Sequence, residues 1–237
     1  MKKTFILLFA LISVFGITAY AALENVSLGK AYTLSTSPAA AYPDDGKMLT
    51  NGSHGETVNG SYHKSGTYIG IPATSIDENG CYTVTVDLGE VKNNITGFDL
   101  YYAAETDANV YAPEYCEFFV SENGEDFTIA GKVMSGEETQ PGIVKAGVIN
   151  SRLKTAVSAR YVRFVIKNPH VQAGDTNSLV NSGWMFIDEV SVLQDDGKTP
   201  ETGDIPIIPI ASLAGAVSAA GGINALRKAI KEKKKNR

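Results

Sequence analysis

The strongest constraint on the fold is an apolar–polar alternation with a period of two, which recurs along the middle of the chain. Between Tyr82 and Leu88, every even position is apolar and every odd position is polar. Similar runs cover 98–102, 116–120 and 161–167, and weaker ones cover 127–131 and 144–153. Such alternation points successive side chains to opposite faces of a strand. Turn-forming residues separate the runs, so we predict an all-β fold, a two-sheet β-sandwich.

The predicted sandwich spans residues 25–195, which is long enough for one sizeable hydrophobic core. No internal repeat is visible in this span. Between Tyr32 and Pro72 the alternation is poor and turn residues are dense. A structureless stretch of this length in a compact domain is usually functional or wrongly assigned. We predict that it wraps over one end of the sandwich as a series of tight turns.

The last strand-like run, Gly183–Leu193, carries two adjacent carboxylates, Asp188 and Glu189. By strict alternation, Asp188 shares a face with the apolar residues at positions 184, 186, 190 and 192, whereas Glu189 faces the other way. Burying a carboxylate is costly unless it is paired or bound to a cation. We therefore expect another part of the chain, or a cation, to approach this pair.

Residues 1–22 have the pattern of a secretory signal peptide. Lys2 and Lys3 precede an apolar run that ends at Phe15, and the small residues Ala21 and Ala22 follow. This order of basic, apolar and small residues predicts export with cleavage after Ala21 or Ala22. The alternative is an uncleaved membrane anchor, although the apolar run is short for a spanning helix.

The C-terminal region predicts an anchor. A polar linker, 196–204, precedes 22 mostly apolar residues, 205–226, and a basic tail that ends at Arg237. The apolar segment is long enough to form a transmembrane helix, with its tail on the cytoplasmic side. Both ends therefore predict that the sandwich lies outside the cell, anchored to its surface.

This C-terminal order, which begins with Thr199-Pro200-Glu201-Thr202-Gly203, resembles the sortase sorting signal of Gram-positive surface proteins. The resemblance implies that sortase cuts between Thr202 and Gly203 and joins the new carboxyl group to peptidoglycan. Thr199 stands where the usual motif has Leu. The alternative is a plain membrane anchor through 205–226.

Without its predicted ends the chain is strongly anionic. Lys and Arg fall from 21 to 12 and Asp and Glu from 26 to 24, so the net charge is 12 − 24 = −12. Such a surface repels nucleic acid. It suits a neutral ligand, a cationic ligand or a bound metal ion.

No catalytic constellation is visible in the sequence. The three histidines are His54, His63 and His170. Nucleophile elbows, zinc-protease motifs and phosphate-binding glycine loops are absent. The carboxylate pairs lie in turn-like stretches, whereas a glycosidase needs two opposed carboxylates in a cleft. We predict a protein that binds without catalysis.

Six short motifs occur in a characteristic order. They are Asn25–Lys30, Leu49–Gly52, Val84–Gly89, Val120–Gly124 followed by Phe127, Ala159–Arg163 and Ile187–Val190. The set resembles the discoidin domain, also called the coagulation factor V/VIII C-type domain, whose bacterial relatives include family 32 carbohydrate-binding modules. The resemblance covers about residues 25–193. It implies a jelly-roll sandwich of the galactose-binding type, with ligand-binding loops at one end.

The resemblance also implies a structural Ca²⁺ ion. In many bacterial members a carboxylate from the final strand closes a calcium site on the loop that matches Leu49–Gly52. By motif, Asn51 stands where the family usually has Asp, and Glu189 is the strand carboxylate. Asp44, Thr57 and the carbonyl of Leu49 are further oxygen donors nearby, and calcium takes six to eight oxygen ligands. The alternative is that Glu189 only caps neighbouring backbone N–H groups.

A sugar-binding site needs an aromatic face together with polar side chains that bind hydroxyl groups. The candidates in the predicted loops are Tyr62, His63, Tyr68, Tyr111, His170 and Asn177. Our first hypothesis is therefore a non-catalytic, cell-surface module that binds an extracellular glycan. The alternative is an adhesin that binds a host protein or a lipid through the same loops.

The two cysteines, Cys81 and Cys116, each begin a predicted strand. In an exported domain two cysteines often pair. Their positions do not match the disulfide usual in the family, and their parity also fits two buried free thiols. The sequence leaves both possibilities open.

Overall fold

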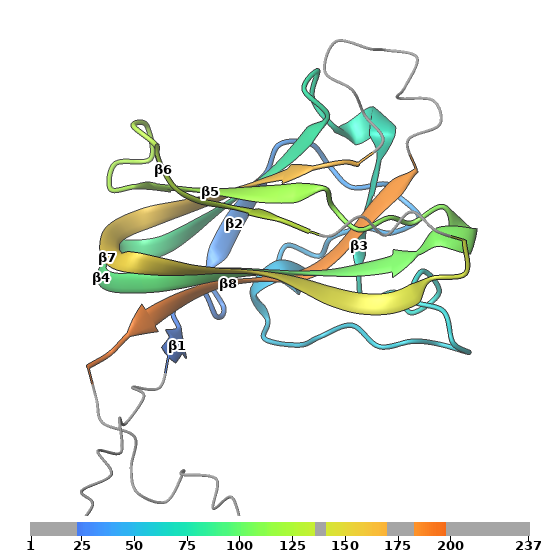
Figure 1. Cartoon of the computed structure of the whole chain (residues 1–237), viewed down its shortest axis with the longest axis horizontal. Coiled ribbons are helices and arrows are strands. Elements are labelled where there is room, and N and C mark those ends of the chain that lie inside the picture. Colours follow the sequence, from blue (N-terminus) through green and yellow to red (C-terminus); the bar gives the residue numbers. More distant parts are fainter. Residues whose placement is uncertain (1–22, 136–140, 170–182, 198–237) are drawn as a thin grey trace, which may run out of the picture. The chain divides into compact units, whose positions relative to one another are not determined.

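Eight strands form the regular structure in the part of the chain described by the computed structural model, which comprises residues 23–135, 141–169 and 183–197 (Figure 1). The strands are β1 (Leu23–Asn25), β2 (Ala31–Leu34), β3 (Ile69–Pro72), β4 (Cys81–Glu105), β5 (Tyr115–Ser121), β6 (Thr128–Met134), β7 (Val144–Lys167) and β8 (Trp184–Asp195). Three short 3-10 helices connect them: η1 (Met48–Thr50), η2 (Ala73–Ser75) and η3 (Thr106–Ala108). The predicted all-β class is thus confirmed for these residues.

The two longest strands, β4 and β7, pair with each other over almost their whole length. Both bend sharply at the same place, where the register between them shifts. In β4 the bend falls at Gly89–Asn94, and both of these residues have positive φ angles, 85° and 56°. Glycine and asparagine tolerate this left-handed conformation better than other residues. The segments 82–88 and 98–102, which read as two strands in the sequence, are therefore two halves of one strand.

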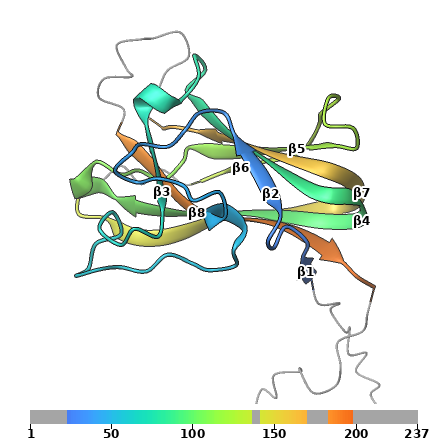
Figure 2. The same ribbon diagram turned by 180° about the vertical axis from the view of Figure 1, so that it is seen from behind.

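The bend folds the sheet into two layers. The first half of β4 pairs with β2 and with the end of β7, which in turn pairs with β5, and β5 pairs with β6. The second half of β4 pairs with the start of β7 and with β8, which also pairs with β1 and β3. Figure 2 shows these layers from behind. The predicted two sheets are therefore one hydrogen-bonded sheet, in the order β1-β8-β4-β7-β5-β6 with β2 and β3 beside it, folded over on itself.

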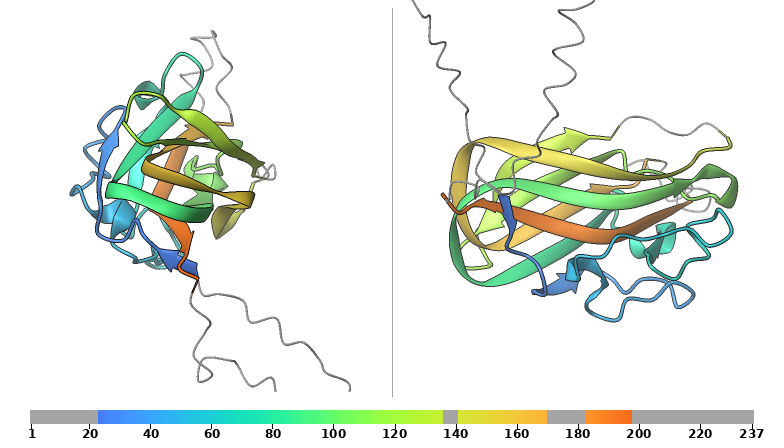
Figure 3. Two further views of the ribbon diagram at one scale, coloured as in Figure 1. Left: turned by 90° about the vertical axis from the view of Figure 1, so that its left-hand side faces the viewer. Right: turned by 90° about the horizontal axis from the view of Figure 1, so that it is seen from below.

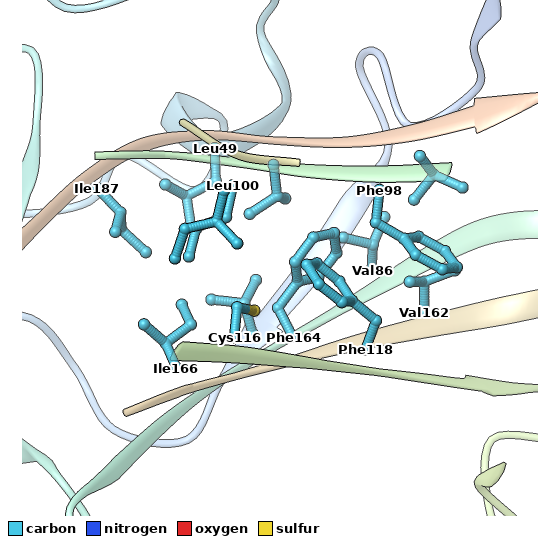
Figure 4. Close-up of a cluster of buried hydrophobic side chains, with 14 of the residues drawn as sticks. Leu49, Val86, Phe98, Leu100, Cys116, Phe118, Val162, Phe164, Ile166 and Ile187 are labelled. Atoms are coloured by element: carbon cyan, nitrogen blue, oxygen red, sulfur yellow. The ribbon is translucent and has the colours of Figure 1, made fainter. Parts of the chain in front are cut away.

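The hydrophobic core fills the space between the two layers (Figure 4). At its centre Phe98 of one layer stacks on Phe118 of the other, with ring centroids 5.2 Å apart, and Phe164 meets Phe118 edge-on at 5.4 Å. All three rings are fully buried. Cys116 belongs to this core, Cys81 is also buried, and both are free thiols.

The bend gives the described domain two distinct ends. At what we call the loop end, β4 finishes at Glu105 and β8 begins at Trp184. At the opposite end, which we call the bend end, β4 and β7 turn over, and β1 pairs with the last residues of β8. The long connection between β2 and β3 does not simply cover one end, as we predicted; it also runs beside β8, and η1 packs against that strand.

Several sequence predictions concern residues outside the described ranges. These are the signal peptide (1–22), the candidate ligands His170 and Asn177, most of the linker, and the sorting motif and apolar segment up to residue 237. Within the described residues, no helix has the length and apolar character needed to span a membrane.

Candidate functional site

A bulge in β8 determines where its two carboxylates point. On β4, Tyr102 pairs with Ile187 and the adjacent Tyr101 pairs with Glu189, so Asp188 is an extra residue without its own partner. Apolar residues on either side of the bulge, at positions 185 and 187 and again at 190 and 192, belong to the core. A bulge shifts the alternation by one residue. The prediction that Asp188 and Glu189 lie on opposite faces is therefore wrong, because both turn away from the core towards the same loop.

The loop after η1 covers both carboxylates. The N–H of Gly52 donates to Oε2 of Glu189 at 3.1 Å, and the N–H of Gly55 donates to Oδ2 of Asp188 at 2.5 Å. The expectation that another part of the chain approaches this pair is confirmed. Asp188 is 3% exposed and Glu189 is 1% exposed. Each nevertheless keeps one oxygen, Oδ1 and Oε1 respectively, with no hydrogen-bond partner in the described part of the chain.

Burial dominates the ionisation of this pair. Desolvation raises the pKa of Asp188 above its usual range, although the N–H of Gly55 and the nearby His54 oppose the shift. Desolvation also raises the pKa of Glu189 to about 7, against the opposing hydrogen bond from Gly52 and with a further increase from the charge of Asp188. Both side chains therefore gain from a proton, or from a positive charge placed against the free oxygens.

The predicted calcium ligands are only partly brought together. Asn51 lies against Glu189 through its backbone N–H, while its side-chain Oδ1 accepts a 2.7 Å hydrogen bond from the N–H of Ser53. Asp44 instead accepts a 2.5 Å hydrogen bond from the hydroxyl of Tyr32.

Leu49 is buried in the core and Thr57 is exposed. No cluster of three or more His, Cys, Asp or Glu side chains that could hold a metal occurs among the described residues. A cation at Glu189 would therefore depend on its free Oε1 and on neutral oxygens.

At the loop end, Glu105 holds the loop that contains Tyr62 and His63. Its carboxylate accepts the hydroxyl of Ser61 at 2.9 and 3.0 Å and the N–H groups of Tyr62 and His63 at 3.0 and 3.2 Å. Nδ1 of His63 lies 3.0 Å from Oε2 of the same carboxylate. Burial alone raises the pKa of Glu105, but the hydrogen bonds from His63 and Ser61 outweigh it, and the net shift is downward.

A local turn explains how this loop reaches Glu105. Asn59 and Gly60 have positive φ angles of 53° and 75°, and Val58 and Ser61 on either side of them exchange two backbone hydrogen bonds. Two successive positive φ angles are typical of a type I′ turn, for which Asn-Gly is the preferred sequence. The turn directs Ser61 and the two following residues towards the end of β4.

An aromatic cluster lies beside the contacts of Ser61 and His63 with Glu105, which we call the clamp. Its members are Tyr42, Tyr62, Tyr68, Trp184 and Phe186, packed with small apolar residues of β4 and η3. Tyr62 meets Tyr68 edge-on with ring centroids 5.7 Å apart, and Tyr42 meets Trp184 at 5.4 Å. Tyr62 and Trp184 are half-buried, so part of each side chain reaches the surface, whereas Tyr68 is only 2% exposed.

Tyr111 is fixed to the start of β8. Its backbone N–H donates to the carbonyl of Trp184 at 2.9 Å, and the N–H of Trp184 donates to the carbonyl of Asn109 at 2.8 Å. A side chain at position 183 would meet the ring of Tyr111 at 2.5 Å, so Gly183 leaves room for that ring. Four of the predicted sugar-binding residues, at positions 62, 63, 68 and 111, thus belong to the loop end.

The structure adds functional candidates that the sequence did not reveal. Glu105 and Ser61 order the loop, while Tyr42 and Phe186 complete the aromatic cluster. The sequence signal for Glu105 is a carboxylate that ends an apolar strand, but its partners lie more than 40 residues earlier in the chain.

The fold and the loop end together define a two-layered, all-β domain with polar and aromatic residues gathered at one end. Residues 48–182 match the F5/8 type C domain family, and the chain belongs to that family. None of the curated proteins matches the chain.

Three solved structures illustrate the similarity. Chitosan-binding module 1 from a Paenibacillus chitosanase/glucanase shares 16% identity over 71% of this chain and 98% of its own, with a TM-score of 0.45. The Clostridium perfringens module CpGH89CBM32-5, in complex with GalNAc-beta-1,3-galactose, shares 15% over 72% and 99%, with a TM-score of 0.45. The Streptococcus pneumoniae fucose-binding module SpX-3 shares 16% over 72% and 97%, with a TM-score of 0.44. Similarities at this level carry no conclusion about the ligand of this chain.

Proposed function

We propose that this domain binds a glycan at its loop end, without catalysis. The observation that carries the proposal is the clamp of His63 and Ser61 on Glu105 beside the partly exposed rings of Tyr62 and Trp184. A half-exposed aromatic ring offers an apolar face to the C–H groups of a sugar, and an ordered imidazole offers a hydrogen-bonding group to its hydroxyls. Tyr111 lies at the same end and joins this proposed surface, and the sequence adds His170 and Asn177, outside the described residues, as further proposed ligands.

The environment of Glu105 supports binding rather than hydrolysis. Its oxygens accept hydrogen bonds from Ser61, Tyr62 and His63, and its pKa is lowered. A glycosidase acid needs a carboxyl group whose pKa is raised and which faces the substrate. We therefore infer that Glu105 positions His63 and does not transfer a proton to a glycosidic oxygen.

The test is a glycan array probed with the full chain and with single-residue variants. Chitosan, GalNAc-beta-1,3-galactose and fucose, the ligands named for the similar modules, are suitable first probes. We expect a discrete set of glycans to bind, and His63→Ala and Tyr111→Ala to abolish that binding. Tyr161→Ala removes an aromatic ring near the bend end and serves as the matched control, with binding retained. A signal from Tyr161→Ala as weak as that of His63→Ala contradicts the proposed site.

An adhesin for a host protein or a lipid is the other outcome of the same experiment. If no glycan on the array binds, but the chain captures a matrix protein or lipid vesicles and His63→Ala prevents that capture, then the ligand is that protein or lipid and not a glycan. No binding in either assay removes the proposal.

We further propose that Ca²⁺ binds beside Glu189. The buried, unpartnered Oε1 and the raised pKa of this carboxylate suit a cation. The backbone N–H of Gly52, which donates to Oε2, does not suit one on that side. The ion would therefore sit on the Oε1 side and take its other ligands from carbonyl oxygens such as that of Leu49, from Asn51 and Thr57, and from Asp44 if it leaves Tyr32.

Export and surface anchoring complete the proposed function. The signal-like residues 1–22 and the anchor-like residues 196–237 support an extracellular, cell-surface location. Mass spectrometry of the mature protein tests this directly. A C-terminus at Thr202 linked to a peptidoglycan fragment supports sortase processing, an intact Arg237 in the membrane fraction supports a membrane anchor, and an intact chain in the cytoplasm contradicts both.

A further inference from the structure

A groove runs along one side of the domain, between β6 and the first half of β7. Its volume is about 580 Å³, and it is lined by residues 130–133 of β6 and residues 150–155 and 157 of β7. The last of these lie where the register between β4 and β7 shifts, at the bend of β7 that Figure 3 shows. A volume of this size is typical of a binding site.

Both strands that border the groove are edges of the sheet in the described part of the chain. β6 pairs only with β5, and residues 144–152 of β7 pair only with β4. An edge strand presents backbone N–H and C=O groups without partners, which a further strand can bind. In β6 a bulge leaves Ala130 without a partner on β5, and a bulge disfavours pairing with another strand. The regular edge of β7 is therefore the better template.

Exposed cations and inward-facing residues alternate along this edge of β7. Arg152 and Lys154 are exposed, whereas Ser151 is buried and Leu153 packs against the core. Successive side chains of a strand point to opposite faces. A strand added beside β7 therefore has the two cations next to its outer face and the other two residues next to its inner face.

The lining of the groove is positively charged in a domain that is otherwise anionic. Lys132, Arg152 and Lys154 line it, and none of the described Asp or Glu residues does. Lys132 pairs with Glu117 at 3.0 Å and Arg152 pairs with Asp99 at 2.6 Å, whereas Lys154 has no ion-pair partner among the described residues. Charges further away than about 8 Å are largely screened at physiological salt. A short ligand with a few carboxylates therefore responds to the groove rather than to the net charge of the domain.

One buried hydroxyl group in the groove lacks a partner. Ser151 is only 5% exposed, and its Oγ has no hydrogen-bond partner among the described residues. Solvent still reaches this oxygen, since it is not one of the fully enclosed atoms that lack partners in the described part of the chain. A Cβ atom on Gly131 would lie 2.9 Å from it, so a side chain at that position would crowd the oxygen. Buried polar groups usually have partners, so a ligand that supplies one here removes a cost.

We propose that the groove binds an acidic peptide in an extended conformation, as an additional strand beside β7. The backbone of the peptide pairs with the free edge of β7, as in other cases of strand addition. Its acidic side chains lie beside Arg152 and Lys154, its apolar side chains lie beside Leu153, and one of its hydrogen-bonding groups reaches Oγ of Ser151. The site shares no residue with the proposed glycan surface around His63.

The first test compares peptides that differ in charge or in order. The probes are a seven-residue peptide of alternating Glu and Val, its counterpart with Gln in place of Glu, and a peptide of the first composition with the Val residues in one block. Each is labelled and titrated with the full chain by fluorescence anisotropy. We expect the alternating acidic peptide to bind, and each of the others to bind about tenfold more weakly or not at all. Equal binding of the acidic peptide and either of the others, or no binding of the acidic peptide, overturns the proposal.

Methylation of the peptide backbone tests the strand pairing itself. Alternate N–H groups of a strand point to the same side, so one alternate set faces β7. Two versions of the acidic peptide, methylated on the backbone nitrogens of Val or of Glu, are therefore compared. We expect one of the two versions to lose binding. Retained binding by both overturns the addition of a strand.

Variants of the chain test the position of the site. Lys154→Gln removes an exposed, unpaired cation, so we expect it to fold normally and to bind the acidic peptide several-fold more weakly, with no change for the Gln peptide. Lys47→Gln is the matched control, since Lys47 is an exposed lysine in the connection between β2 and η1, and its binding should stay that of the original chain. Arg152 is kept because it pairs with the buried Asp99. Unchanged binding by Lys154→Gln, or an equal loss in the control, overturns the site.

Other ligands and positions are outcomes of the same experiments. Binding of heparin that depends on Lys154, without binding of the peptide, assigns the groove to an acidic polysaccharide and overturns the peptide. Peptide binding that His63→Ala abolishes lies at the loop end and overturns the groove. Loss of array binding in His63→Ala while the peptide still binds shows that the two sites are separate, so each proposal can fail alone.

Discussion

The N–H of Gly52 donates a 3.1 Å hydrogen bond to Oε2 of Glu189 and so joins the loop after η1 to the last strand across 137 residues of sequence. Only one of the two carboxylate oxygens is satisfied in this way. The relationship fixes the loop against β8, and it leaves a buried acidic group whose charge state should be visible in the stability of the domain.

The stability of the domain should fall as the pH rises towards neutrality. Burial raises the pKa of Glu189 from 4.5 to about 7, so the folded state binds a proton that the unfolded state has released. The contribution is fully present below about pH 4.5 and is lost as the pH rises through about 7. Without calcium, we expect Glu189→Gln to reduce the difference in the free energy of unfolding between acidic and neutral pH by up to about 3 kcal/mol. Urea unfolding at about pH 5 and about pH 8, with a chelator, measures it, and identical pH profiles for both proteins contradict the prediction.

Calcium should stabilise the domain through Glu189. A ligand that binds only the folded state adds about 2.7 kcal/mol at a hundred times its dissociation constant. We expect millimolar CaCl₂ to raise the melting temperature of the original chain by several degrees relative to EDTA. Glu189→Gln should lose most of this increase, and MgCl₂ should not replace calcium. An equal increase in the variant means that calcium binds elsewhere.

Glu105→Gln should loosen the loop that carries His63. The folded state lowers the pKa of Glu105, so its contribution is present above the usual pKa of a glutamate and is lost as the pH falls through the lowered value. We expect the variant to cost about 1–3 kcal/mol at neutral pH and less in acid. Limited proteolysis should cut the variant first between residues 58 and 67.

Glu90→Gln is the matched control, since Glu90 is an exposed carboxylate that pairs with Lys92 at the bend end. Its stability and its proteolysis pattern should stay those of the original chain. The same loop cleavage in this control would show that Glu105 has no particular role.

Gly55→Ala should be destabilising for a steric reason. A Cβ atom at this position would lie 2.1 Å from Cε2 of Tyr68, far inside contact distance. Inserting a methyl group into such a packed site costs about 1–3 kcal/mol. The double variant Gly55→Ala/Tyr68→Leu should recover part of the loss relative to the sum of the single variants, because the substitutions then compensate each other. Strictly additive free energies of unfolding contradict this contact.

The sequence predicts the strands of this domain better than it predicts its site. Alternation identifies the segment 82–88 because one of its faces is buried, and the adjacent carboxylates Asp188 and Glu189 stand out because they interrupt an apolar strand. Their direction could not be predicted, since a bulge adds one residue without leaving a mark in the alternation. The continuity of β4 could not be predicted for a different reason. Gly89 and Asn94 are residues that usually end a strand, so the sequence suggests two strands instead of one bent strand.

The loop-end contacts depend on pairs of residues that are far apart in the chain. Ser61 precedes Glu105 by 44 residues, and Gly55 precedes Asp188 by 133 residues. Nothing local in either segment specifies its partner, because each hydrogen bond joins segments that only the folded chain brings together. The turn at Asn59-Gly60 is the exception, since its geometry follows from its own two residues.

The pairing of β1 with the end of β8 has a mechanical consequence. Leu23 lies opposite Asp195, so the first and the last strand of the described domain lie side by side at the bend end. Trp184, by contrast, starts β8 at the loop end. If the proposed ligand site and the proposed anchor are both correct, tension between them would therefore act along β8. The hydrogen bonds from β4 and β3 to this strand would then share the force in shear and resist it together.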